Sequence, residues 1–170
     1  MEKITLSRRA AFAALAAFAV APGAAHAGPA TPRFREIRVD VSPLADKNEA
    51  VYGSWIAAAL PGYLKQTFAK FLAPGDRSAA VLVARVDLVI IGSPDQRAVG
   101  AQSQSDTTDS IDGAGVVLDG RGQAIATYPL FSAMTASSET NSPYQEEIVR
   151  RRVETLALSF AQWLPGQMGL

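Results

Sequence analysis

Two segments of the chain have the hydrophobic pattern of β-strands. In residues 34–43, FREIRVDVSP, the apolar Ile37, Val39 and Val41 alternate with charged residues, as in a strand with one buried face. Residues 78–92, SAAVLVARVDLVIIG, are mostly apolar, with charge only in the middle of one face, which is typical of a strand near the centre of a sheet. Unbroken alternation puts six of its residues on one face: Ala80, Leu82, Ala84, Val86, Leu88 and Ile90.

Residues 49–72 carry apolar and aromatic side chains in steps of about four, which predicts a helix with one buried stripe. Pro61 and Gly62 interrupt this segment. Because proline lacks a backbone N–H and clashes with the preceding turn, we expect a kink or a break there. The aromatic residues of the stripe are interpreted as part of the core and not as a ligand site.

A second helix is predicted between residues 141 and 164. Ser142 suits the N-cap, Pro143 the first helical position and Gln145 the third, which together make a capping-box pattern. Pro165 and Gly166 are expected to end this helix, because proline does not continue the hydrogen-bond ladder.

A polar segment and a hairpin lie between the second strand and the second helix. Residues 93–111 are rich in Gly, Ser, Thr and Gln and predict a long polar loop. Residues 112–136 hold two β-prone runs around Asp119-Gly120-Arg121-Gly122, which predicts a hairpin with a tight turn. Pro129 indicates that the second run is an edge strand or bulges at that residue.

The predicted order of elements is therefore β-α-β-β-β-α. This order predicts an α+β domain of two layers over residues 34–166, with two helices packed on one face of a mixed sheet. A β-α-β opening crosses over in the right-handed sense, so the first two strands are expected to be parallel. Residues 28–33, GPATPR, read as a short flexible lead.

The first 27 residues have the three parts of an export signal. Lys3, Arg8 and Arg9 give a positive beginning, residues 10–21 are almost wholly apolar, and Ala25-His26-Ala27 fits a small-residue cleavage site at Ala25 and Ala27. The apolar run is too short to cross ~30 Å of hydrocarbon, so no stable membrane anchor is expected. A soluble periplasmic protein starting near Gly28 is the expected product.

The route of export is open between two alternatives. The stretch from Ser7 to Phe12 resembles a twin-arginine signal, in which a phenylalanine follows the arginine pair by two positions. Here Phe12 comes one position late. A general secretory signal that happens to hold Arg8 and Arg9 is the other interpretation.

Composition excludes several functions for the mature chain. Loss of residues 1–27 removes three of the 16 basic and one of the 16 acidic side chains, which leaves a net charge of −2 and does not favour nucleic-acid binding. The chain has no cysteine, and His26, its one histidine, lies in the signal. A thiol nucleophile, a Ser-His-Asp triad and a zinc site of N and S ligands are therefore excluded, and no cofactor is expected.

The tetrads RVDV (38–41) and RVDL (85–88) repeat on the first two predicted strands. Both place arginine and aspartate on the face turned away from the helices. Arg38, Asp40, Arg85 and Asp87 are therefore a candidate interaction face for a polar ligand or partner. The alternative is a set of cross-strand ion pairs that keeps an exposed face soluble.

Three aspartates, Asp106, Asp109 and Asp112, recur every third residue in and next to the polar loop and are weak candidates for a calcium site. Their spacing does not match an EF-hand, so a solvated loop is the preferred interpretation. Arg150, Arg151 and Arg152 follow Glu146 and Glu147 at helical spacing and are expected to form a solvated face.

The order of elements and the strand end IRVDVSPL before a long helix look like the domain in the N-terminal part of TolB-type proteins. They are also similar to the domain of lipoproteins that activate penicillin-binding proteins in the cell envelope. The resemblance covers most of residues 34–164. The lipidated cysteine of those activators is absent here, and no functional residue is carried over.

Two function classes follow from the sequence. The first is a non-catalytic periplasmic binding or accessory module of the cell envelope, whose partner is an envelope protein or a second copy joined through an exposed sheet edge. The second is a small carboxylate-based enzyme or a periplasmic protein that binds a metal through oxygen ligands. The second requires carboxylates that converge in one site.

Overall fold

The computed structural model describes residues 32–45, 49–92, 108–135 and 145–170. Every described residue belongs to one compact unit, Thr31–Leu170. The predicted export signal, with Arg8, Arg9, Ala25 and Ala27, lies outside the described residues. So do Ser142 and Pro143 of the predicted capping box.

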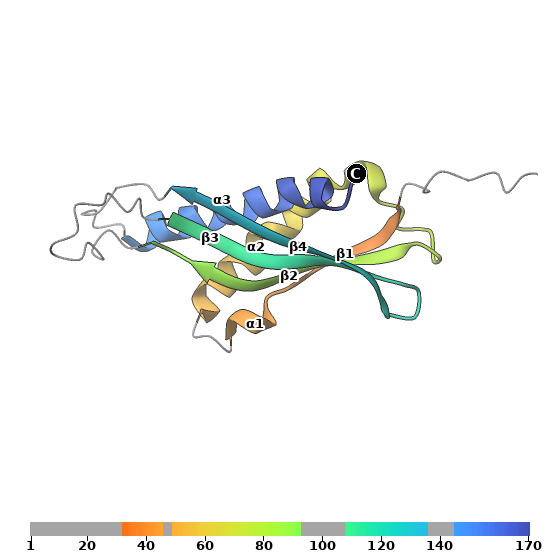
Figure 1. Ribbon diagram of the computed structural model, residues 1–170, viewed down its shortest axis with the longest axis horizontal. Helices are drawn as coiled ribbons and strands as arrows, with labels where there is room; N and C mark the ends of the chain where they lie inside the picture. The colour runs from red at the N-terminus through yellow and green to blue at the C-terminus, as the bar shows by residue number, and fades with distance from the viewer. Residues whose placement is uncertain (1–31, 46–48, 93–107, 136–144) are drawn as a thin grey trace, which may run out of the picture. The chain divides into compact units, whose positions relative to one another are not determined.

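A four-stranded sheet and two long helices make up this unit (Figure 1). The strands lie in the order β1-β2-β3-β4, with β1 parallel to β2 and the other pairs antiparallel. The α+β fold, the element order and the parallel first pair are confirmed, and a short helix, α1, is added. The elements are β1 (Phe34–Asp40), α1 (Ser42–Ala45), α2 (Ala50–Thr67), a 3-10 turn (Ala69–Phe71), β2 (Ala80–Ile90), β3 (Thr108–Leu118), β4 (Ala124–Thr135) and α3 (Gln145–Gln167).

The core lies between one face of the sheet and the helices α2 and α3. From α2 the buried stripe keeps its predicted step of four: Ile56, Leu60, Leu64 and, just past the helix end, Phe68. Phe68 meets Phe34 of β1 edge to face, with ring centroids 5.9 Å apart. From α3 the buried residues are Val153, Leu156, Ala157, Phe160, Ala161 and Leu164.

A bulge in β2 overturns the predicted alternation of that strand. Val86 pairs with Gly113 and Leu88 with Asp112, so Asp87 is one residue extra on β2. Beyond the bulge the faces exchange. Val89 is 2% exposed in the core and Ile90 is 49% exposed on the other face, the reverse of the predicted placement. A bulge leaves no mark in a run of apolar residues, so the period-two pattern could not show it.

The two internal prolines do not end their helices. Helix α2 runs through Pro61 without a break, where the predicted alternatives were a kink or a break. Ala57, whose carbonyl loses its helical donor to Pro61, is exposed, so water can bond that oxygen. Helix α3 contains Pro165 and ends at Gln167, three residues later than predicted. Its last turn is closed by hydrogen bonds to the Pro165 oxygen from the N–H groups of Met168 and Leu170.

The hairpin between β3 and β4 is confirmed at the predicted turn. The Asp119 carboxylate accepts hydrogen bonds from the N–H groups of Arg121 (2.8 Å) and Gln123 (2.9 Å), and Gly122 adopts a φ of 81°. Strand β4 is an edge strand, as Pro129 indicated. The predicted loop over 93–111 is too long at its C-terminal end, because β3 already begins at Thr108.

Candidate functional site

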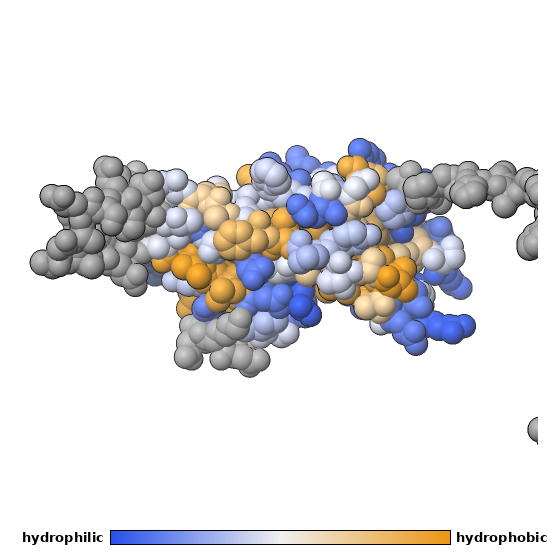
Figure 2. Space-filling model, in the orientation of Figure 1, coloured by the Kyte–Doolittle hydropathy of each residue, from blue (hydrophilic) through white to orange (hydrophobic). Residues whose placement is uncertain are grey.

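The face of the sheet turned away from α2 and α3 is the candidate functional site, and we call it the uncovered face. In Figure 1 the strands pass in front of both long helices, so this face is turned toward the viewer. Figure 2, in the same orientation, shows hydrophilic and apolar surface side by side over the strands. The charged and the apolar parts lie at different places in the sheet, and both include residues of β2.

The charged part lies on β1 and the neighbouring half of β2. Two ion pairs here join residues two apart on the same strand. Arg38 bonds Glu36 of its own strand with both Nε (2.8 Å) and Nη2 (2.7 Å). Arg85 bonds Asp87 two residues on, with Nε 2.9 Å from Oδ1. Asp40 is the register partner of Arg85, so these two members of the predicted set are direct cross-strand neighbours.

Two carboxyl groups on this part have lowered pKa values. The hydrogen bond from Arg38, helped by its charge, lowers the pKa of Glu36, and the same contact raises the pKa of Arg38. The pKa of Asp40 is lowered chiefly by hydrogen bonds from the hydroxyl and the N–H of Ser42, at 2.7 and 3.0 Å. These groups stay ionised well into acid, and each already has a neighbour in its own strand or in the turn that follows.

The apolar part lies on β4 and the far half of β2. We call Leu88, Ile90, Phe131 and Ala133 the apolar patch. Phe131 is 67% exposed and Ile90 is 49% exposed. The register places Phe131 opposite Asp112 and Asp112 opposite Leu88, while the next row runs from Ala133 through Ser110 to Ile90. The patch therefore spans three strands, a width of ~10 Å.

Asp112 stands in the middle of this patch. It is exposed, and within the described part of the chain its carboxylate takes part in no hydrogen bond or ion pair. Its neighbours in register, Phe131 and Leu88, are apolar. An exposed carboxylate beside apolar side chains is a suitable contact for a basic group on a partner's apolar surface.

Asp109 lies on the opposite face, so the weak calcium hypothesis fails for this pair. Residues three apart in a strand point to opposite sides, and Asp109 is 1% exposed beneath α3. Asp106 lies outside the described residues. No group of three or more His, Cys, Asp or Glu side chains in the described ranges could hold a metal ion.

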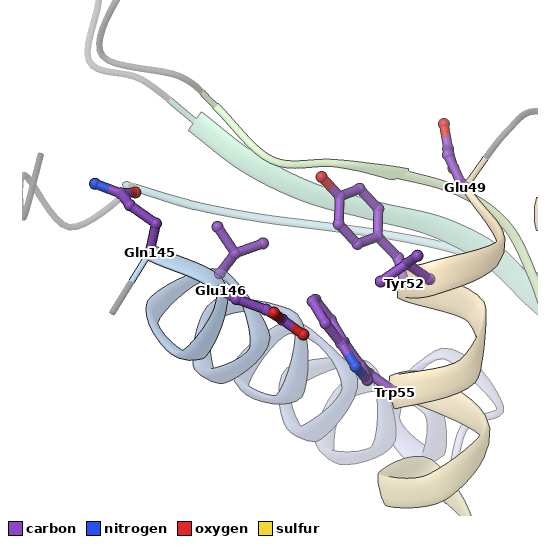
Figure 3. Close-up of a pocket in the computed structure, with 7 residues that line it drawn as sticks. Glu49, Tyr52, Trp55, Gln145 and Glu146 are labelled. Carbon is purple, nitrogen blue, oxygen red and sulfur yellow. The ribbon is translucent and has the colours of Figure 1, made fainter. Parts of the chain in front are cut away.

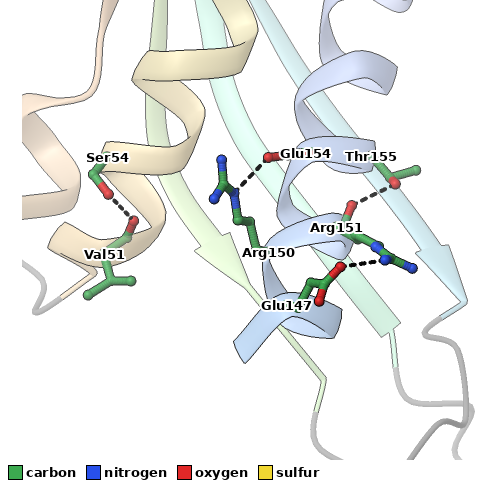
Figure 4. A network of polar contacts seen from close by, with 7 residues as sticks. All are labelled: Val51, Ser54, Glu147, Arg150, Arg151, Glu154 and Thr155. Carbon is green, nitrogen blue, oxygen red and sulfur yellow. Dashed lines mark hydrogen bonds and ion pairs between the residues drawn. The ribbon is translucent and has the colours of Figure 1, made fainter. Parts of the chain in front are cut away.

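Arg152 is the partner of Asp109, which corrects the prediction of a solvated arginine face. The Arg152 side chain is 13% exposed and bonds both carboxylate oxygens of Asp109, with Nε 2.8 Å from Oδ2. It also donates to the oxygen of Gly92 (2.7 Å), whose N–H bonds Asp109 (2.9 Å). Arg150 and Arg151 are exposed and pair with Glu154 and Glu147 on α3 (Figure 4). The three arginines therefore divide between surface and interior.

The hydrophobic pattern did not single out the apolar patch, although one signal for it was present in the sequence. Both alternating sets of β4 contain large apolar residues, with Tyr128 and Leu130 on one side and Phe131 on the other. Pro129 already marked this strand as an edge. In a two-layer fold the helices cover only one face of the sheet. The apolar residues of β4 that point to the other face therefore lie in solvent.

No protein-family model and no curated protein sequence matches this chain. Solved structures resemble it at low identity. A minor lipoprotein from Acinetobacter baumannii is 17% identical with a TM-score of 0.43, covering 76% of this chain and 91% of its own. A PelC dodecamer from Paraburkholderia phytofirmans is 14% identical with a TM-score of 0.42, covering 83% and 91%. The rare lipoprotein B from Shewanella oneidensis is 9% identical with a TM-score of 0.42, covering 79% and 93%.

At these scores no residue role is taken from these proteins. None of the described helices is long and apolar enough to cross a bilayer.

Proposed function

We propose that this chain is an exported, non-catalytic binding module of the bacterial cell envelope, which works in the periplasm and binds a protein partner through the apolar patch. The observation that carries the proposal is the exposure of Phe131 and Ile90 on the same face, at 67% and 49%. Exposed apolar patches rimmed by polar groups are typical of protein interaction sites. Burying one such side chain in a complex contributes about 1.5–3 kcal/mol.

Asp112 defines the chemistry of the partner. A carboxylate in the middle of an apolar interface costs free energy unless the partner supplies a positive group for it. We therefore propose a partner surface with apolar side chains around one lysine or arginine. The ion pairs Arg85–Asp87 and Arg38–Glu36 would lie at the rim of this interface, where charge adds selectivity more than affinity.

A second copy of this chain is the less favoured partner. Strand β4 is an edge strand and has no charged residue between Ala124 and Thr135, so pairing two such edges brings no like charges together. Such pairing would lengthen the sheet in its own plane, however, and would leave Phe131 and Ile90 in water. A partner that lies over the face accounts for both residues.

The periplasmic location rests on the sequence of residues 1–27, with the twin-arginine and general secretory routes both still open. The resemblance to TolB-type proteins and to activators of penicillin-binding proteins stays an interpretation of element order. It is in keeping with a binding role, and it assigns no residue.

Photocrosslinking in a living Gram-negative host tests the proposal. A photoreactive phenylalanine analogue replaces Phe131 in one strain and Ile90 in another. Gln66, exposed on α2, is the matched control position. We expect one protein adduct of the same mass from the two sites on the uncovered face and none from Gln66. We also expect Asp112→Lys to remove the adduct, since it sets two positive charges against each other.

Three other results would contradict the proposal. An adduct of twice the mass of the chain identifies a second copy, and a lipid adduct identifies a membrane surface. An equal yield of the adduct from the probe at Gln66 shows that the partner does not bind preferentially at the apolar patch. Cell fractionation, with the mass of the product, tests the location separately, because an uncut cytoplasmic product removes the periplasmic claim whatever the patch binds.

A further inference from the structure

A groove between the first turns of α2 and α3 lies apart from the uncovered face (Figure 3). Its volume is about 400 Å³, within the range of small-molecule sites. Its lining residues are Glu49, Val51, Tyr52, Trp55, Gln145, Glu146 and Val149. The aromatic stripe of α2, predicted to be core, is therefore only partly so, because Tyr52 and Trp55 stay half-buried at the wall of this groove.

The walls are aromatic and the charged groups are all acidic. Figure 3 shows Tyr52 and Trp55 projecting from α2 toward α3, with the carboxylate of Glu146 turned toward Trp55. The two rings are tilted by 42°, with centroids 5.9 Å apart. No lysine or arginine is among the lining residues. Ring faces carry negative charge density, so rings and carboxylates together attract a cation.

We infer that this groove binds an organic cation, an ammonium group on an apolar body. The apolar body would contact Val51, Val149 and the rings, and the positive group would lie between Trp55 and Glu146. A bare metal ion is a poorer fit, because calcium takes six to eight oxygen ligands and the lining offers two carboxylates. One of these, Glu49, already accepts a hydrogen bond from the N–H of Val89 at 3.1 Å.

Acidic residues at the start of a helix also stabilise the helix, and a test of binding has to distinguish this effect from contact with a ligand. A carboxylate in the first turn of a helix is stabilised by the helix dipole, and this applies to Glu146 and Glu147 alike. Glu147 does not line the groove and pairs with Arg151 on the surface of α3 (Figure 4). Glu147 is therefore a matched control, since it shares the position in the helix and lacks the groove.

A fluorescence titration of the exported full chain tests the inference. Trp163 is 62% exposed, and its replacement in Trp163→Phe leaves Trp55 as the single tryptophan, at the wall of the groove. The probes are choline and its uncharged carbon isostere, 3,3-dimethylbutan-1-ol. We expect a saturable change in Trp55 emission with choline. We expect the affinity for the uncharged isostere to be lower than that for choline by a factor of about ten or more.

Variants complete the test. Glu146→Gln is expected to weaken choline binding about fivefold or more, and Glu147→Gln is expected to leave it unchanged. Three results would each overturn the inference. The isostere could bind as tightly as choline, the two variants could lose the same affinity for choline, or the emission change with choline could fail to saturate. Phosphatidylcholine vesicles distinguish two sources of the same group: displacement of choline by vesicles assigns the cation to a lipid headgroup, and no displacement assigns it to a free molecule.

Discussion

The two faces of the sheet hold their charges in opposite ways. On the face under the helices, Asp109 and Arg152 form a buried pair, with side chains 1% and 13% exposed. On the uncovered face, Arg38–Glu36 and Arg85–Asp87 keep between 32% and 55% of their side chains in water. The pair under the helices joins Gly92 and the start of β3 to α3. Breaking this pair is expected to lower the free energy of unfolding by a large amount. The pairs on the uncovered face are exposed to solvent, and each such ion pair contributes little to the free energy of unfolding.

The largest expected effect comes from breaking the buried pair. Arg152→Met removes the positive group and leaves the Asp109 carboxylate buried without it, so we expect the free energy of unfolding to fall by about 3–5 kcal/mol. Urea unfolding followed by circular dichroism measures this loss. Arg151→Ala, which removes an exposed pair one residue away, is the control and should cost less than about 0.5 kcal/mol. Similar losses in the two variants would show that burial does not separate these arginines.

A smaller loss is expected where the helices meet the sheet. A Cβ added at Gly115 would lie 2.7 Å from the Cδ1 of Leu164, so Gly115→Ala forces this fully buried leucine to move. We expect a loss of about 1–3 kcal/mol. Gly120→Ala, at a turn position with no atom within 4 Å of the new Cβ, should stay within about 0.5 kcal/mol of the parent. The same unfolding measurement compares the two, and equal losses would contradict the close packing at Gly115.

A pH series tests the charged part of the uncovered face. The pKa of Asp40 is lowered in the folded state, chiefly by Ser42, so ionised Asp40 stabilises the fold at pH values above its ordinary pKa of 3.8. This contribution is lost as the pH falls through the lowered value. Ser42→Ala should therefore reduce the urea midpoint at pH 6 and have little effect at pH 2. A pH-independent effect of Ser42→Ala would show that its hydroxyl acts on something other than this carboxylate.

The smallest effect on stability is expected at the apolar patch. Phe131 is two-thirds exposed, so Phe131→Ser should change the free energy of unfolding by no more than about 0.5 kcal/mol. The same substitution should abolish crosslinking from the probe at Ile90, which measures binding. A loss of several kcal/mol would show that Phe131 belongs to the core, and the contrast between the faces would then fail at this residue.

Much of the fold could be predicted because each element has a regular period. The stripe of α2 recurs every four residues, β1 alternates, and Asp119 to Gly122 have the chemistry of a tight turn, so all three were placed correctly. What could not be predicted depends on contacts distant in sequence. The bulge at Asp87 is visible only against β3, and continuous helix through Pro61 and Pro165 is stabilised by packing that the local pattern does not contain.

The candidate site was less accessible to sequence reasoning for the same reason. Alternation alone predicted one shared face for Arg38, Asp40, Arg85 and Asp87; in the structure Asp40 and Arg85 are register partners, and each arginine pairs with a carboxylate of its own strand. Asp109 and Arg152 are 43 residues apart, so nothing local distinguished Arg152 from Arg150 and Arg151. The groove between α2 and α3 depends on how two helices pack, which helical spacing does not specify.

The most direct test of this account measures two quantities on one variant, Asp112→Lys. Asp112 is exposed and has no ion pair among the described residues, so the account predicts an unfolding free energy within about 0.5 kcal/mol of the parent. It also predicts loss of the protein adduct formed from Phe131 in living cells. Retention of the adduct, or its loss together with several kcal/mol of stability, would contradict the claim that the uncovered face serves binding and the covered face serves the fold.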